Sequence, residues 1–312
     1  MEECKKKLYA VVGPTASGKT ALGVEICKRI GGEVVSCDSM QIYRHMDIAT
    51  AKPTAKEMQG IPHHLIDFLE PDEVFSVADY CEKAAEVIDD IHSRGRVPVL
   101  VGGTGLYYSS LTEGLTFFEE KSDFEYRELL KARAEAEGGE VLLKELQAVD
   151  PEAAAKLHPN NTGRIIRALE IYHTTGKTIT QQNILSKAGG SRYDVRTVCL
   201  DARNRDFLYD RINRRVDEMI EAGLVEEAKR FYDSGFGRTA VQAIGYKELL
   251  PFLRNEKTLS DCVENLKMQT RRYAKRQLTW FRHRDNIDFL YIDDGLSPQE
   301  LAGAAIEIFQ RM

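Results

Sequence analysis

The stretch LYAVVGPTASGKT, residues 8–20, decides the fold, because a short apolar run leads directly into a glycine-rich loop and a helical pattern. Its last part matches G-x-x-x-x-G-K-[ST] in full. Glycines at this spacing let backbone amides surround an anion at the positive end of the following helix, while the lysine reaches the terminal phosphate and the last hydroxyl binds Mg²⁺. The sequence therefore predicts a phosphate-binding loop made of Gly13, Pro14, Thr15, Ala16, Ser17, Gly18, Lys19 and Thr20, with Thr20 as the metal ligand.

Short β-branched runs separated by helical patterns continue this architecture along the chain. Ser76 and Asp79 stand at the spacing of a capping box that starts a helix. Such alternation is typical of a parallel sheet covered on both faces, so the predicted fold class is α/β. We expect strands over 8–12, 33–37, 97–101, 195–200 and 288–293, and helices over 18–30, 78–93, 205–231 and 297–311.

The pattern changes after Phe118, and no convincing strand run follows until about residue 190. Helical patterns such as YRELLKARAEAE and GRIIRALEIYHTTGK fill the interval. We therefore predict a P-loop α/β core formed by residues 1–118 and 191–312, interrupted by a helical insertion over residues 119–190.

The composition excludes several classes of protein. The 312 residues carry 43 Lys and Arg against 49 Asp and Glu, a formal net charge of −6, and 43% of them are hydrophobic. These values are typical of a globular chain and not of a disordered or fibrous one. No apolar run approaches the roughly 18 residues of a membrane helix, so no membrane partner is expected. The six scattered cysteines have no metal-binding spacing, which predicts reduced thiols and a cytoplasmic protein.

The phosphate loop does not by itself identify the molecule that it binds. A nucleoside triphosphate is the usual ligand, and an ATPase or GTPase then carries an acidic residue at the end of a later apolar strand. Here the candidate strand, VPVLV at 97–101, is followed by GGTGLY and by no carboxylate. The sequence thus gives a reason to consider a different diphosphate.

Two polar residues lie just beyond strands of the predicted sheet: Asp38 directly follows one, and Thr104 follows another after two glycines. Ligands of open parallel sheets bind beyond the carboxyl ends of the strands, so these ends should converge near the phosphate loop. Asp38 is a candidate general base or hydrogen-bond acceptor, and Thr104 is a candidate donor to a phosphate oxygen. From position alone, a helix cap or turn for Asp38 and an ordinary turn residue for Thr104 are equally open.

Further motifs carry a resemblance to a known family. After the phosphate loop come DSMQIYR, TAKPT with IPHHLID, GGTGLY, HPNNTGRIIRALEIY, AIGYKEL and AKRQLTWFR, in this order, so that the motifs span about residues 8–284. Together they closely resemble the tRNA dimethylallyltransferases (tRNA isopentenyltransferases), the bacterial form in particular. The resemblance implies a P-loop core with a helical insertion. It also implies transfer of a dimethylallyl group to N6 of the adenosine on the 3′ side of a tRNA anticodon.

The same resemblance implies a task for each candidate residue. The loop would hold the diphosphate of dimethylallyl diphosphate with Mg²⁺ at Thr20, Asp38 would accept the proton of the attacking amine, and Thr104 would lie near the diphosphate. Arg211 and Arg215, one helical turn apart, are a candidate clamp on the same diphosphate. A solvated helix face is the alternative for this pair.

A basic segment over residues 271–284 carries six Lys or Arg and no acid, with aromatic residues between them. Basic side chains contact phosphates and aromatic rings support stacked bases, as RNA loops require; an amphipathic helix with solvated arginines is the alternative. The target adenine must leave its stack to reach a buried donor, and Gln41 is the candidate for recognising its edge. The resemblance assigns to tRNA contact Asp38, Ser39, Met40, Gln41, Thr104, Arg127, Gly163, Arg164, Arg167, Gln242, Gly245, Tyr246, Lys247, Lys275, Arg276, Gln277, Thr279, Trp280 and Arg282.

The chain departs from the family pattern at a few positions. Ala49 stands where glycine is usual, Asn161 replaces an aspartate, and Gly163 replaces a longer polar residue, which weakens Gly163 as a side-chain contact. His63 and His64 have no further ligands near them in the sequence. We expect these histidines to pack beside the cleft and not to bind a metal.

Two other functions compete with prenyl transfer. A small-molecule or nucleoside kinase shares the phosphate loop, the sheet and an arginine-bearing lid helix, but gives no task to GGTGLY or to the basic segment. An RNA-binding module switched by a nucleotide would not need Asp38 for chemistry. The expected state is a monomer that binds the anticodon stem-loop of tRNA.

Overall fold

The computed structural model describes residues 5–117, 123–187, 189–234 and 243–311. Contacts between residues divide the chain into two compact units. The first, the core unit, comprises Met1–Thr112 and Arg192–Met312, and the second, the helical insertion, comprises Glu113–Ser191. Each unit buries a hydrophobic core of its own.

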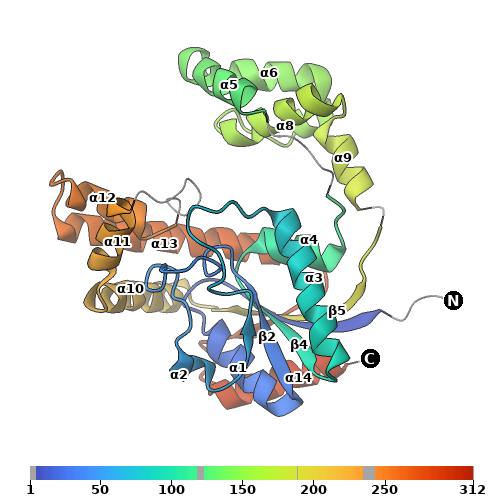
Figure 1. Ribbon diagram of the computed structural model, residues 1–312, viewed down its shortest axis with the longest axis vertical. Helices are drawn as coiled ribbons and strands as arrows, with labels where there is room; N and C mark the ends of the chain where they lie inside the picture. The colour runs from blue at the N-terminus through green and yellow to red at the C-terminus, as the bar shows by residue number, and fades with distance from the viewer. Residues whose placement is uncertain (1–4, 118–122, 188, 235–242, 312) are drawn as a thin grey trace. The chain divides into compact units, whose positions relative to one another are not determined.

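A six-stranded parallel sheet lies at the centre of the core unit, with the order β3-β2-β4-β1-β5-β6 among the described residues (Figure 1). All of its pairs are parallel, so every return of the chain to the sheet passes through a crossover. The predicted α/β class is confirmed. The strands are β1 (Lys6–Val12), β2 (Gly32–Cys37), β3 (His63–His64), β4 (Val97–Gly102), β5 (Tyr193–Asp201) and β6 (Ile287–Tyr291).

Helices cover both faces of this sheet, with α3 on one side and α1 and α14 on the other (Figure 1). No helix within the described parts of the chain has the length and apolar character needed to cross a membrane. The helices of the core unit are α1 (Lys19–Ile30), α2 (Ala55–Met58), α3 (Val77–Ser93), α4 (Gly105–Glu113), α10 (Arg205–Glu221), α11 (Leu224–Asp233), α12 (Tyr246–Leu253), α13 (Leu259–Arg282) and α14 (Pro298–Gln310).

Alternate side chains of the strands enter different cores on the two faces of the sheet. In β1, Leu8 and Ala10 pack on the side of α3 and α4, whereas Val11 packs on the side of α1 and α14. Burial of both faces explains why these strands are apolar without alternation in the sequence. Ser76 and Asp79 form the expected capping box at the start of α3.

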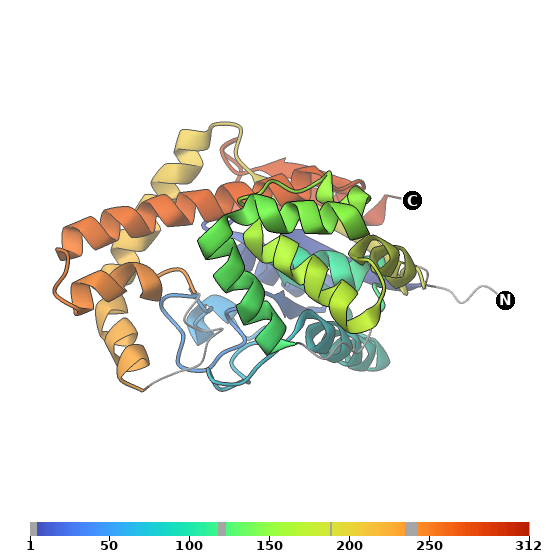
Figure 2. The same ribbon diagram turned by 90° about the horizontal axis from the view of Figure 1, so that it is seen from above.

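Helices α10–α13 pack around a further hydrophobic cluster, and the long helix α13 contacts both α10 and α12 (Figure 2). The single helix that the sequence predicts over 205–231 is wrong. Gly223 adopts a φ of +98°, a left-handed conformation that suits glycine, and it separates α10 from α11. The turn lets α11 fold back toward α12, which makes the cluster possible.

The helical insertion packs leucine and isoleucine side chains between its helices. Within it Glu170 is fully buried and accepts hydrogen bonds from Arg127 at 2.7 Å and Arg167 at 3.0 Å. A buried carboxylate requires such partners, so both arginines, predicted to contact tRNA, also hold this core together. Its helices are α5 (Phe124–Glu137), α6 (Gly139–Val149), α7 (Pro151–Ala154), α8 (Thr162–Thr175) and α9 (Ile179–Ser186).

The loop that follows β2 is fixed by one buried carboxylate. Glu227 of α11, 4% exposed, accepts hydrogen bonds from the backbone amides of Asp47 at 3.0 Å, Ile48 at 2.8 Å and Ala49 at 2.9 Å. The hydroxyl of Tyr246 on α12 donates a fourth at 2.9 Å. Three consecutive amides on one carboxylate hold the loop in a single conformation against α11 and α12.

Replacement of Glu227 by alanine should lower the free energy of unfolding of the core unit by roughly 3 kcal/mol, because four buried donors lose their acceptor. Urea denaturation of the full chain measures this change. Glu226→Ala is the matched control, since Glu226 is the exposed neighbour on the same helix and should alter stability by no more than about 0.5 kcal/mol. Equal stability of the two variants would contradict the role of Glu227.

Candidate active site

A cavity of about 870 Å³ lies in the core unit where the carboxyl ends of the central strands meet. It is lined by the phosphate loop, by the turn after β2, by the loop that Glu227 holds, and by residues of α10 and α13. A cavity of this size is typical of small-molecule sites at the strand ends of open α/β sheets. The structure therefore brings the segments predicted to converge to one place.

The phosphate loop lies between β1 and α1, and its shape depends on glycine. A Cβ on Gly13 would lie 2.6 Å from the carbonyl oxygen of Leu200 on β5, and Gly13 has a φ of +143°. At the other end of the loop, Gly18 caps α1 with a φ of +94°. The backbone is thus closely packed on one side and free to present amides on the other.

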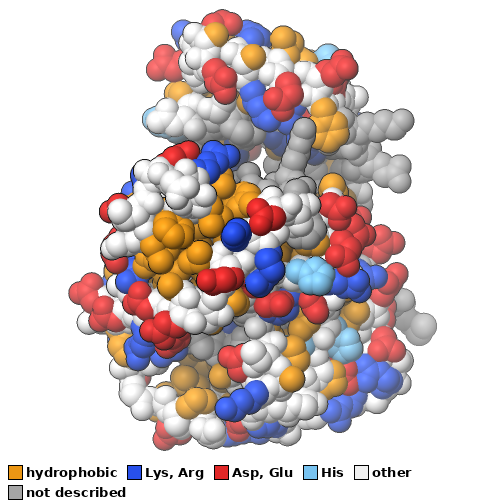
Figure 3. Space-filling view, turned by 60° about the vertical axis from the view of Figure 1, so that its left-hand side comes forward, with side chains coloured by type: hydrophobic (Ala, Val, Ile, Leu, Met, Phe, Trp, Pro, Cys, Tyr) orange, Lys and Arg blue, Asp and Glu red, His pale blue; other side chains and the backbone are white. Residues whose placement is uncertain are grey.

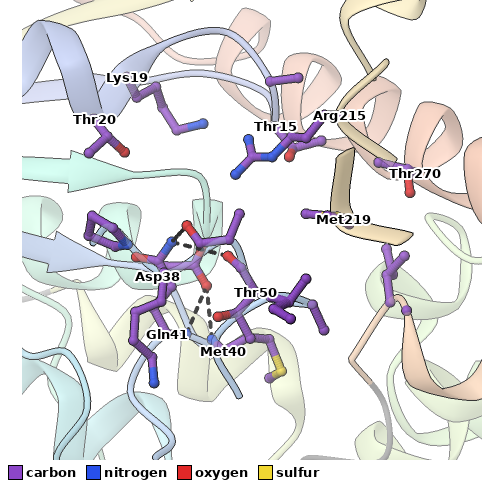
Figure 4. A pocket seen from close by; sticks show the side chains of 18 of the residues that line it. Thr15, Lys19, Thr20, Asp38, Met40, Gln41, Thr50, Arg215, Met219 and Thr270 are labelled. Carbon is purple, nitrogen blue, oxygen red and sulfur yellow. Dashed lines mark hydrogen bonds between the residues drawn. The ribbon is translucent and has the colours of Figure 1, made fainter. Parts of the chain in front are cut away.

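Lys19 has its amino group inside the loop, where it donates a hydrogen bond to the carbonyl oxygen of Pro14. Burial lowers the pKa of Lys19 to about 8, and the positive charge of Arg215 contributes. Burial likewise lowers the pKa of Arg215. Figure 4 shows Lys19 and Arg215 on one side of the cavity and Asp38 on the other. A bound anion would relieve this concentration of positive charge.

Arg211 stabilises the phosphate loop directly, because its Nε donates to the carbonyl oxygen of Ala16 at 2.8 Å. Arg211 and Arg215 both line the cavity and do not form a solvated helix face. The two arginines reach the loop from α10, far away in sequence. This placement is the one that a clamp on a loop-bound anion requires.

Asp38 stands directly after β2 and lines the cavity. Its Oδ1 accepts hydrogen bonds from the amides of Met40 at 2.9 Å and Gln41 at 3.3 Å, so it does cap the following turn (Figure 4). Within the described residues no hydrogen bond is made to Oδ2, which shares the cavity with the charges of Lys19 and Arg215. The carboxylate can therefore keep its turn and still accept a proton.

Thr104 lies behind this turn. Its Oγ1 accepts a hydrogen bond from the amide of Ser39 at 3.0 Å and its own amide donates to the carbonyl of Cys37 at 3.1 Å. Both contacts connect the end of β4 to the residues on either side of Asp38. Thr104 thus positions the candidate base, a task that the sequence does not reveal.

Gln277 is predicted to contact tRNA, but the structure gives it another task. The side chain is 6% exposed; its Oε1 accepts from the amide of Thr15 at 2.9 Å and its Nε2 donates to the carbonyl of Gly103 at 2.9 Å. It therefore joins α13 to the phosphate loop and to the end of β4. With one hydrogen bond at each end of its amide, Gln277 positions both segments.

Gln41 lines the cavity, as a residue that recognises a base should. Its Nε2, however, donates to the carbonyls of Thr50 at 3.2 Å and Ala51 at 3.1 Å. The amide group that would donate to a base therefore already holds the loop, and recognition by Gln41 would depend on its carbonyl oxygen.

Other residues assigned to tRNA divide into exposed and internally bonded groups. Lys275, Arg276 and Thr279 are exposed on α13. Trp280 donates from its indole to Ser109, and Arg282 is paired at 2.6 Å with the buried carboxylate of Asp201. The assigned residues that line the cavity include Ser39, Met40, Gly245, Lys247 and Arg276. Tyr246 is buried against Glu227, and Gly163 and Arg164 lie on α8 of the insertion. Gln242 lies outside the described residues.

His63 and His64 lie on the short strand β3, beside the cavity. His64 pairs with the buried Glu33 at 2.7 Å, and that carboxylate also holds Arg94. These hydrogen bonds keep the pKa of Glu33 low, at about 2. Within the described ranges no three His, Cys, Asp or Glu side chains are grouped to hold a metal.

Comparison with known proteins identifies the family. The family model described as IPP transferase matches residues 41–284. The tRNA dimethylallyltransferase of Caldanaerobacter subterraneus is 49% identical over 298 residues, 95% of each chain, and that of Bacillus subtilis is 47% identical over 310 residues, 99% of this chain and 97% of the other.

Solved structures agree with this result. The full-length tRNA isopentenylpyrophosphate transferase of Bacillus halodurans superposes with a TM-score of 0.72 at 46% identity, covering 98% of this chain and 97% of its own. A eukaryotic dimethylallyltransferase acting on tRNA gives a TM-score of 0.76 at 32% identity, covering 92% of this chain and 74% of its own. The resemblance seen in the sequence motifs is confirmed: the chain belongs to the IPP transferase family, that of the tRNA dimethylallyltransferases.

Proposed function

We propose that this chain transfers a dimethylallyl group from dimethylallyl diphosphate to N6 of the adenosine that follows the anticodon in tRNA. The products are N6-(dimethylallyl)adenosine and diphosphate. Membership of the family supports the reaction. The observation that carries the assignment of residues is the meeting of the phosphate loop, the α10 arginines and Asp38 around one cavity.

The cavity has two chemically different parts. Lys19, Arg211 and Arg215 supply positive charge for the diphosphate, which leaves as the allylic C–O bond breaks. Met40, in the turn after β2, and Met219, one turn after Arg215 on α10, are among the apolar residues of the lining that suit a short hydrocarbon group. An allylic diphosphate has one group for each part, which a bare phosphate does not.

Asp38 acts on the other substrate. As the new C–N bond forms at the exocyclic amine, that nitrogen must lose a proton, and the carboxylate of Asp38 accepts it. The hydrogen bonds of Oδ1 to the turn keep the carboxylate in place. Thr104 fixes the same turn from behind, through Ser39.

Mg²⁺ suits the residues at the mouth of the loop. The hydroxyl of Thr20 lines the cavity, and oxygen atoms are the ligands that Mg²⁺ prefers. Thr20 would hold the ion against the diphosphate, where it would stabilise the charge of the leaving group.

A kinase is less compatible with the end of β4. This strand pairs with β1, the place where the acidic residue of P-loop ATPases is expected, and it ends at Gly102. A Cβ there would lie 2.1 Å from the carbonyl oxygen of Cys37, so no acidic side chain fits. The end of β4 therefore has room for a glycine turn and not for an acidic side chain.

The reaction is tested first with unmodified tRNA, Mg²⁺ and radiolabelled dimethylallyl diphosphate. Label should appear on the RNA, depend on Mg²⁺, and move to N6-(dimethylallyl)adenosine after digestion to nucleosides. ATP with a labelled γ-phosphate serves as the comparison. Transfer or hydrolysis of that phosphate, without prenyl label on the RNA, would replace prenyl transfer by the kinase alternative.

Asp38→Asn should lower the single-turnover rate by about 100-fold or more, the scale expected for loss of a general base. Asparagine keeps a carbonyl oxygen for the amides of Met40 and Gln41, so the turn persists while the proton acceptor is lost. Affinity for tRNA, measured by filter binding, should stay within about twofold. A rate equal to that of the unaltered chain would exclude Asp38 as the base.

Arg276→Gln should weaken tRNA binding. In a plot of the logarithm of the binding constant against the logarithm of the salt concentration, the slope should become shallower by about 0.7–0.9, the value of one phosphate contact. Arg276 is suited to this test because it is exposed, lines the cavity and lies over the ring of Tyr273. Arg276→Lys keeps the charge and should keep the slope. An unchanged slope in Arg276→Gln would mean that Arg276 contacts no phosphate, and that α13 is an amphipathic helix with solvated arginines. Arg282 is unsuitable for this test, since its replacement would leave the buried carboxylate of Asp201 without its ion-pair partner.

A further inference from the structure

Two buried polar atoms beside the cavity have no hydrogen-bond partner among the residues that the structure describes. They are Oγ of Ser36 and Nε2 of His63, and both residues line the cavity. Ser36 is 3% exposed. A buried hydroxyl or imidazole without a partner costs free energy, and its presence points to a group that binds there.

The fold places both atoms on the α1 face of the sheet. His63 of β3 is paired in register with Val34 of β2, and Ser36 is two residues further along β2, so all three side chains share one face. Val34 packs in the cluster that contains α1, and Thr20 lies in the first turn of α1. Thr20, Ser36 and His63 therefore lie along one wall of the cavity.

The hydrogen-bonding character of His63 can be assigned. Its Nδ1 lies 2.9 Å from the carbonyl oxygen of Ile61, which can only accept, so Nδ1 carries the proton. Burial lowers the pKa of His63, which favours the neutral ring. In a neutral ring protonated at Nδ1, Nε2 is an acceptor. The wall thus offers one acceptor, Nε2, and one hydroxyl that can donate or accept.

This pair of groups distinguishes between ligands. Oxygen atoms of a diphosphate only accept, so they satisfy Ser36 but not Nε2 of His63. A water bound to a divalent cation is a strong donor, because the cation polarises it, and it satisfies both groups. Mg²⁺ in proteins usually keeps several waters. With no three acidic or imidazole groups gathered among the described residues, an ion held by Thr20 and the diphosphate would keep water at its remaining positions.

We propose that Ser36 and His63 bind the water shell of the divalent cation held at Thr20, and so set the affinity of the site for that ion. The inference rests on the proposed function, since it takes the phosphate loop to bind a diphosphate with a cation. The two residues touch neither the diphosphate nor the prenyl group. They position the ion through its waters.

The test measures binding, not turnover. Inorganic diphosphate is titrated into the full chain by calorimetry at a series of free Mg²⁺ concentrations. Mg²⁺ should increase the affinity for diphosphate, and the titrations give the Mg²⁺ concentration at which half of this increase is reached. Ser36→Ala and His63→Asn should each raise that concentration by about tenfold, the lower end of the effect of losing groups that orient a metal site. His63→Asn keeps a donor for Ile61 while Nε2 is lost.

Two further variants separate this role from a structural one. His63→Gln places an amide oxygen near the position of Nε2 and should recover most of the Mg²⁺ affinity. Ser110→Ala is the matched control. Ser110 is equally buried and its hydroxyl also has no partner within the described ranges, but it lies on α4 and does not line the cavity. It should leave the Mg²⁺ dependence unchanged.

The outcomes are distinguishable. An Mg²⁺ dependence in Ser36→Ala and His63→Asn equal to that of the unaltered chain would overturn the inference and leave the proposed function standing. Diphosphate binding that ignores Mg²⁺ in the unaltered chain would also overturn the inference, whereas prenyl transfer itself is decided by the label on the RNA. The inference is supported if Ser36→Ala and His63→Asn alone need about tenfold more Mg²⁺ and His63→Gln recovers most of the Mg²⁺ affinity.

Discussion

The close packing of backbone at the carboxyl ends of β2 and β4 is the constraint on which the site depends. A Cβ on Gly102 would meet the carbonyl of Cys37 at 2.1 Å, and one on Gly103 would meet the amide of Gln277 at 2.2 Å. Because no side chain separates these strand ends, the residues that follow them come within hydrogen-bond distance of one another. The turn of Asp38 and the phosphate loop are joined through this contact, by Thr104 on one side and Gln277 on the other.

The electrostatics of the cavity contrast with the acidity of the chain. The sequence has a net charge of −6, and Figure 3 shows both signs of charge interspersed on one face of the surface. Lys19 and Arg215 nevertheless share a cavity in which burial lowers the pKa of each. The charge of Asp38 offsets this in part, and a bound anion would offset it further. The whole-chain charge is therefore no guide to what the site binds.

The sequence predicts what is local and misses what is distant. The phosphate loop, the capping box of α3 and the parallel strands are found because a few neighbouring residues determine each of them. The break at Gly223 is missed since a single glycine within a helical pattern does not show which φ it adopts. The task of Glu227 is missed for another reason: its amide partners lie about 180 residues earlier, and no local pattern encodes such a contact.

The difference between local motifs and distant contacts also explains why several residues within recognisable motifs have two tasks. Gln41 lies in a motif that suggests base recognition, yet its amide holds the loop that Glu227 holds from the other side. Asp38 caps its own turn with one oxygen and presents the other to the cavity. A base that must meet a flipped adenine cannot also be free to move, because catalysis depends on its position to within a fraction of an ångström. The hydrogen bonds that look structural would therefore hold Asp38 where the proposed base has to be.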